Sequence, residues 1–165
     1  MPLAAQDTRP DSLRETFNDW IVQCQPSDAA PGGESGGESG GQMCEMVQQI
    51  DHQQSGQRVL AFSIRPGTTG ADPVAVMILP FGLRLSEGVT LREGDAVVAT
   101  FGFDTCLAGG CVVIAPLDAP MVDRMRRGAS ISVVMTTRNG GSVGVPVSLS
   151  GFSRAMDRLA ALAGA

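Results

Sequence analysis

The sequence contains no lysine and no tyrosine, and it has a single histidine and a single tryptophan among its 165 residues. All positive charge therefore comes from twelve scattered arginines, and the formal net charge is -5. Nucleic-acid binding requires a concentrated basic surface that displaces counterions from phosphates. The one dense basic group, Arg124, Arg126 and Arg127, sits beside Asp123 and is typical of a solvated helix face. The composition therefore argues against nucleic acid as a partner.

Long apolar runs are also missing. No stretch approaches the roughly 18 consecutive apolar residues that a membrane-spanning helix requires, so we expect no membrane span. The first six residues, MPLAAQ, resemble the small-residue end of a signal-peptide cleavage site. These features predict a protein that is exported and whose signal peptide is removed.

Residue patterns for catalysis are equally scarce. His52 precedes a polar turn and is more typical of a solvated turn histidine than of the base of a nucleophilic site. No G-x-S-x-G motif occurs, and the Gly-rich segment near residue 35 lacks the Gly-Lys-Ser/Thr ending of a phosphate cradle. The carboxylates are spread singly, and a pair of Asp104 with Asp118 across a hairpin mouth is the one acid/base alternative. The sequence therefore predicts no catalytic residue, no cofactor and no metal site.

Alternating apolar residues dominate the chain from Asp19 onward. They form eight or nine short segments that are separated by turn residues, without the rhythm of parallel β-α-β units. Residues 74–79 are apolar on both faces, which is typical of a central strand. The segment from Val97 to Phe103 predicts one strand that leads directly into Cys106. This pattern predicts an all-β protein, for which a β-sandwich fits best.

Two helices and two flexible segments complete the predicted organisation. Asp118 is expected to cap a short helix that ends at Gly128. A C-terminal helix is indicated by apolar residues at helical spacing, namely Phe152, Met156, Leu159 and Ala163. We expect residues 1–16 to form a flexible arm, with a short helical stretch near residues 12–15, and residues 17–165 to form one domain. Within it, the Gly/Glu/Ser segment 31–42 is expected to be a mobile loop.

The four cysteines allow three disulfide connectivities, and only Cys24 with Cys44 plus Cys106 with Cys111 closes two local hairpins. Two alternatives remain open: a zinc site and a redox-active pair. Structural zinc sites favour two closely spaced pairs, and a lowered thiol pKa is usually found at a helix N-terminus. Trp20 lies near the face of Cys24, which is typical of a sandwich core. Two structural disulfides would place folding in the periplasm or outside the cell.

Together these features resemble the invasion-associated locus B family of bacterial envelope proteins. The matching segments are WIVQC at 20–24, Cys44 with VQQ at 47–49, LPFGLRL at 79–85 with Gly88-Val89, FGFDTC at 101–106 with GCV at 110–112, and GVPVSLSGF at 144–152. The resemblance covers about residues 17–160. It implies an immunoglobulin-like sandwich, a cleaved export signal and, for the founding member, a role in bacterial entry into host cells. It implies no reaction. The Gly/Glu/Ser insertion departs from the usually shorter connection of the family.

The sequence thus favours a non-enzymatic binding or accessory protein in the periplasm or secreted, which acts on a protein partner in the envelope or on a host surface. Exposed sheet edges offer such a protein a binding mode that needs no dedicated pocket. A host-cell invasion factor is the second hypothesis. Thiol chemistry at Cys106 and Cys111 is the third.

Overall fold

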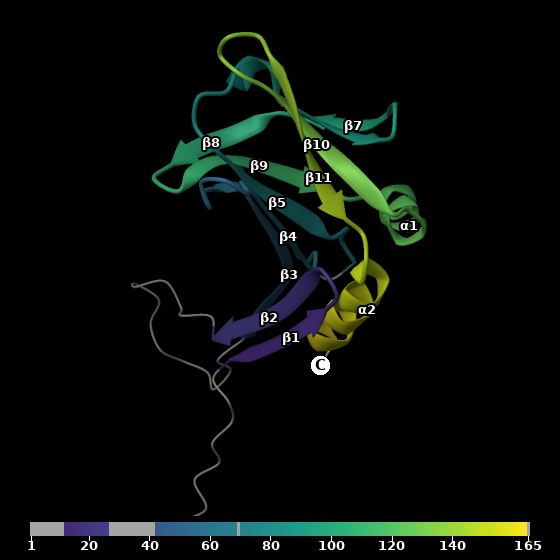
Figure 1. Cartoon of the computed structure of the whole chain (residues 1–165). Coiled ribbons are helices and arrows are strands. Elements are labelled where there is room, and N and C mark those ends of the chain that lie inside the picture. The colour runs from purple at the N-terminus through teal and green to yellow at the C-terminus, as the bar shows by residue number, and fades with distance from the viewer. Residues whose placement is uncertain (1–11, 27–41, 69, 165) are drawn as a thin grey trace, which may run out of the picture.

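The computed structural model describes residues 12–26, 42–68 and 70–164, which form two antiparallel sheets and two helices (Figure 1). The seven-stranded sheet contains, in spatial order, β1 (Leu13–Phe17), β2 (Trp20–Pro26), β3 (Gln42–Asp51), β4 (Arg58–Arg65), β5 (Val74–Leu79), β9 (Gly110–Pro116) and β8 (Phe103–Leu107). The four-stranded sheet contains β11 (Ser142–Ser148), β10 (Ser130–Thr136), β6 (Val89–Glu93) and β7 (Ala96–Phe101). The remaining elements are η1 (Leu85–Glu87), α1 (Ala119–Arg127) and α2 (Phe152–Ala163).

The predicted immunoglobulin-like β-sandwich with a short helix and a C-terminal helix is confirmed. Asp118 caps α1 as expected, because its side chain accepts a hydrogen bond of 2.9 Å from the Met121 amide. The strand of residues 74–79 lies inside the larger sheet, between β4 and β9. Neither helix among the described residues is long and apolar enough to cross a membrane.

One buried cluster joins both sheets and the C-terminal helix. Trp20 is fully buried and packs edge to face against Phe62 of β4 and Phe152 of α2, at ring-centroid distances of 6.0 and 5.5 Å. The helix α2 contacts β1, β2 and β3, so it covers the part of the larger sheet that extends beyond the smaller one (Figure 1). Trp20 is therefore a core residue, as its position predicted.

A polar junction ties the two sheets at one corner of this core. Gln48, the one buried polar residue of the described chain, sits on the inner face of β3 and reaches the last residue of β11. Its Oε1 accepts a hydrogen bond from the Ser148 amide, and its Nε2 donates to the Ser148 carbonyl, both at 3.0 Å. The Trp20 indole N–H donates to the same carbonyl at 2.9 Å. The Gln48 side-chain amide thus supplies the donor and the acceptor that a neighbouring strand would supply to β11.

Residues 13–16 differ from the expected flexible arm. They form most of β1, whose register pairs Leu13 with Cys24 and Phe17 with Trp20, so neither disorder nor the helical stretch predicted near residues 12–15 is correct for them. The sequence pattern did not indicate this strand, because a charged residue, Glu15, interrupts its inner face. Glu15 is paired with Arg158 of α2. Residues 1–11 lie outside the described chain.

The chain bends at Gly102, where one continuous strand was predicted. β7 ends at Phe101 in the smaller sheet, and β8 begins at Phe103 at the edge of the larger one. A glycine within a strand pattern often marks such a bend, because it has no side chain to keep on one face. The predicted Gly/Glu/Ser loop at 31–42 lies outside the described residues, except for Gln42, which begins β3.

We predict that Gln48→Leu lowers the free energy of unfolding by about 1–3 kcal/mol, because it leaves the part-buried Ser148 amide without a partner and the Ser148 carbonyl with only the Trp20 indole as donor. The measurement is urea denaturation followed by tryptophan fluorescence. Gln49→Leu is the matched control, since Gln49 is exposed on the opposite face and its side chain bonds only to Asp51. Its effect should stay within about 0.5 kcal/mol. Equal losses in both variants would refute the role of the junction.

A second prediction concerns pH. Arg158 donates two hydrogen bonds to Glu15, of 2.7 and 2.9 Å, and these bonds lower the pKa of Glu15 from its ordinary value of 4.5. A lowered folded-state pKa stabilises the protein above pH 4.5, and this contribution disappears as the pH falls through the folded-state pKa. Glu15→Gln should therefore be less stable than the wild type at pH 7, and the difference should vanish in acid. In an Arg158→Gln background the substitution should have no pH-dependent effect.

Candidate functional site

The cysteines form two cross-strand disulfides. Cys24 lies opposite Cys44 on β2 and β3, and Cys106 lies opposite Cys111 on β8 and β9. This is the connectivity that closes two local hairpins. The first bond is buried, whereas Cys106 is exposed on the edge strand β8. The described chain contains no free cysteine, and both pairs serve in the structure as covalent ties between neighbouring strands.

The candidate acid/base residues do not come together. His52 is exposed in the β3–β4 turn, where its Nδ1 accepts hydrogen bonds from the amides of Gln54 and Ser55, both at 3.3 Å. Asp104 lies on β8 beside Val113 of β9, whereas Asp118 caps α1 five positions further along, a separation of roughly 16 Å at strand spacing. Within residues 12–26, 42–68 and 70–164, no three His, Cys, Asp or Glu side chains are grouped to hold a metal ion.

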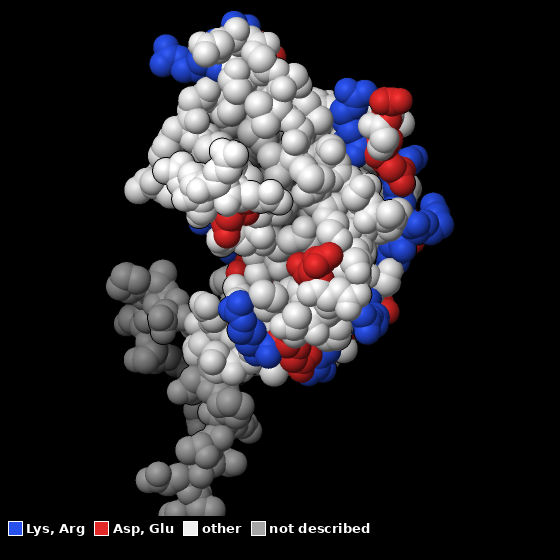
Figure 2. Space-filling view, viewed as in Figure 1, with Lys and Arg blue, Asp and Glu red and all other residues white. Residues whose placement is uncertain are grey.

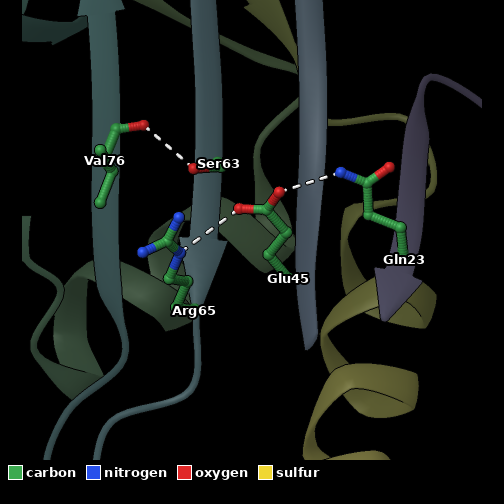
Figure 3. A network of polar contacts seen from close by, with 5 residues as sticks. All are labelled: Gln23, Glu45, Ser63, Arg65 and Val76. Atoms are coloured by element: carbon green, nitrogen blue, oxygen red, sulfur yellow. Dashed lines mark hydrogen bonds and ion pairs between the residues drawn. The ribbon is translucent and has the colours of Figure 1, made fainter. Parts of the chain in front are cut away.

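Several charged side chains form ion pairs with one another. Arg124 pairs with Glu93 at 2.8 Å, and Arg126 pairs with Asp157 at 2.9 Å, so the predicted solvated helix face is largely neutralised. On the outer face of the larger sheet, Glu45 accepts hydrogen bonds from Gln23 of β2 and Arg65 of β4 (Figure 3). Figure 2 shows that these charges leave a broad front face with few charged side chains.

An apolar groove opens on the β11 side of the sandwich. Its volume is about 640 Å³, against about 340 Å³ for a hollow beside α1 and about 420 Å³ for one beside α2. It combines the end of β3 with the first part of β11, on the β10–β11 turn side of the Gln48 junction. The groove, called the β11 groove below, is lined by Ile50–Gln54, Val59, Pro80–Leu83, Met135, Thr137 and Val143–Pro146. Two of these side chains are large, apolar and substantially exposed: Phe81 at 60% and Val143 at 43%.

Backbone hydrogen bonds hold the wall that carries Phe81. The Arg138 amide donates to the Gly82 carbonyl at 3.0 Å, and the Arg84 amide donates to the Thr136 carbonyl at 2.8 Å. Leu83 forms an antiparallel bridge with Thr137. The segment after β5 is thus attached to the β10–β11 hairpin, which gives the β11 groove a wall that exists before any ligand binds.

The strand that borders the groove is an open edge. Among residues 12–26, 42–68 and 70–164, β11 pairs with β10 alone, so its other edge is open in this part of the chain. Residues of an antiparallel strand alternate between facing the neighbour and facing away, and the Ser148 groups bound by Gln48 face away from β10. The register has no bulge, so the backbone groups of Gly144 and Ser142 face the same open side. Pro146 lies between them and Ser148 and offers a carbonyl but no amide donor.

Sequence reasoning missed this site. The patterns indicated strands near residues 143–149 and 44–50, and the open edge was considered in general terms, but no strand order could be assigned. Gln48 was noted only as part of the VQQ segment that resembles the family. A glutamine at an inward position of an alternating strand was the one available signal for the junction.

Comparisons with known proteins place the chain among relatives. The family model described as "Invasion associated locus B (IalB) protein" matches residues 20–160. An invasion protein B homolog of Brucella abortus is 34% identical over 152 residues, which cover 92% of this chain and 81% of the relative. Invasion protein B of Bartonella bacilliformis is 31% identical over 156 residues, which cover 92% and 76%. The crystal structure of invasion associated protein b from Bartonella henselae matches with a TM-score of 0.73 and 30% identity, over 92% of this chain and 97% of that one.

We predict that the two disulfides differ in accessibility. A mild reductant should open Cys106–Cys111 in the folded protein before Cys24–Cys44, because Cys106 is exposed and the other pair is buried. Stepwise reduction, alkylation and peptide mass mapping would measure the order. Simultaneous opening of both bonds in the folded state would contradict the prediction, and an unfolded sample provides the control in which burial no longer matters.

Proposed function

The chain belongs to the invasion-associated locus B family, and on that premise we propose that it is an exported, non-enzymatic envelope protein that acts by binding another protein. The observation that carries the proposal is the β11 groove, an apolar hollow beside an open strand edge in a domain held by two disulfides. Disulfides of this kind persist in oxidising compartments, which supports export to the periplasm or beyond.

The absence of a grouped catalytic set among the described residues favours binding over chemistry. His52 uses one ring nitrogen to hold its own turn, and Asp118 caps a helix. Apolar grooves with a few convergent polar groups are the usual form of ligand sites, and an open strand edge adds backbone donors and acceptors to this one.

A role in entry into host cells is the second candidate function. It is favoured by the relatives from Brucella and Bartonella, which carry the name invasion protein B. This version of the proposal requires that the protein is exposed on the cell surface or released. Thiol chemistry at Cys106–Cys111 is a weaker candidate, and a reduction potential below about -300 mV, typical of structural disulfides, would count against it.

The test of the binding function is chemical cross-linking in intact cells that express the full-length precursor with a C-terminal tag. We expect the tagged protein in the periplasmic or secreted fraction, oxidised at all four cysteines, and joined repeatedly to the same envelope protein. A protein that remains in the cytoplasm with free thiols would overturn the proposal. Mass mapping of the unreduced peptides identifies the pairing and the neighbours in one sample.

Protease treatment separates the two versions of the function. Trypsin added to intact cells should cleave a surface-exposed protein, for which the exposed turn at Arg138 offers a site. If cleavage requires prior permeabilisation of the outer membrane, the protein is an internal envelope component and the host-contact version loses its basis. A known periplasmic protein in the same cells serves as the control for leakage.

A further inference from the structure

We propose that the β11 groove binds an extended peptide segment of a partner protein, which pairs with the open edge of β11 at Gly144 and carries an acidic residue beside Arg138. The inference rests on the proposed function and names the chemistry of the partner. Its apolar residues would alternate, because every second side chain of a strand added beside β11 points to the same face as Val143 and Val145.

The open edge of β11 carries backbone hydrogen-bond donors and acceptors. Beyond Ser148, which Gln48 occupies, Gly144 and Ser142 each present an amide donor and a carbonyl acceptor to the open side. Pro146 marks the limit, since it offers no donor, so the accessible part of the edge is the part that borders the groove.

The shape of the groove suits an added strand. An added strand would continue the smaller sheet, and its inward side chains would meet Ile50 and Val59 of the larger sheet and the ring of Phe81. The Gln48 junction closes one end of this space, and the β10–β11 turn borders the other. The groove therefore accepts a short segment with small or medium apolar side chains at alternate positions.

The third feature expected of the partner is a negative charge that complements Arg84 and Arg138. Arg84 and Arg138 directly follow Leu83 and Thr137 of the groove lining, and Arg84 donates a hydrogen bond to the Arg138 carbonyl. Figure 2 shows basic side chains at the top of the view, where Figure 1 places the β10–β11 turn. Glu87 pairs with Arg84, but no ion pair among the described residues involves Arg138. A carboxylate of the partner would supply an ion-pair partner for Arg138.

A second copy of the chain fits less well. Symmetric pairing of two β11 edges would bring together segments of sequence SVGVPVS, which contain no carboxylate. Arg138 would then stay unpaired, and each Pro146 would withhold a donor from the opposing strand. The observations therefore favour a different protein segment, and self-association is an outcome that the experiment must be able to detect.

The binding test uses the full chain and a displayed library of random ten-residue peptides. We expect selection of peptides with alternating apolar residues and a terminal Asp or Glu. Gly144→Pro should weaken their binding by about tenfold or more, because it removes an edge donor without removing a bond to β10. Gly144→Ala is the matched control: it keeps the amide, the added methyl has ordinary contact distance, and binding should change less than about threefold.

The charge of the partner is tested separately. Arg138→Glu should weaken binding of the acidic peptides by about two- to fivefold, and replacing the acidic residue of the peptide with Lys should restore it. Thermal melts of all variants show that the fold is retained. Selected peptides that bind wild type and Gly144→Pro equally would overturn the proposal.

Photo-cross-linking in cells distinguishes failure of this inference from failure of the proposed function. A photoreactive residue at Val143 samples the groove, and one at the exposed Val97 of β7 samples a different edge. Adducts with another protein at position 143 that disappear with Gly144→Pro support the inference. Adducts at position 97 alone overturn it but leave a binding function standing, and adducts of position 143 with a second copy overturn it in favour of self-association. No adduct at either position counts against both.

Discussion

The structure depends on one side-chain amide that substitutes for a strand. The two sheets differ in width, and β11 ends opposite β3 without a strand to pair with. Gln48 fills that position with a donor and an acceptor, and the Trp20 indole adds a second donor to the same carbonyl. Because the three groups are part-buried, each would be costly without the others. The corner is therefore fixed, and the β11 groove lies beside it.

Much of the fold was predictable because each strand carries its own pattern. The alternation in β2, β3, β4 and β10 and the cap of helix α1 are local signals, and these elements lie where their patterns indicated. The signal that would have predicted β1 was not local. Glu15 on its inner face is compatible with the core only because Arg158 of α2 binds it, and that partner lies 143 positions away.

The candidate site was less predictable for the same reason. Groove walls come from the end of β3, the segment after β5 and the start of β11, and no sequence pattern shows that these segments meet. The alternation around Val143 indicated a strand but not whether one or both of its edges are paired. Cys106 and Cys111 behaved differently, because two strands joined by a short turn bring their cysteines into register without help from the rest of the chain.

The distance along the chain between Gln48 and Ser148 has a consequence for how the molecule assembles. The two residues are 100 positions apart, whereas Cys24–Cys44 closes over 20 positions and Cys106–Cys111 over 5. Contacts between distant residues form late, since the entropy of a long loop opposes them until other parts are in place. The hairpins and their disulfides can form while the corner is still open. We therefore expect the disulfide-bearing hairpins to form before the Gln48–Ser148 contacts, which require β11 to dock against the end of β3.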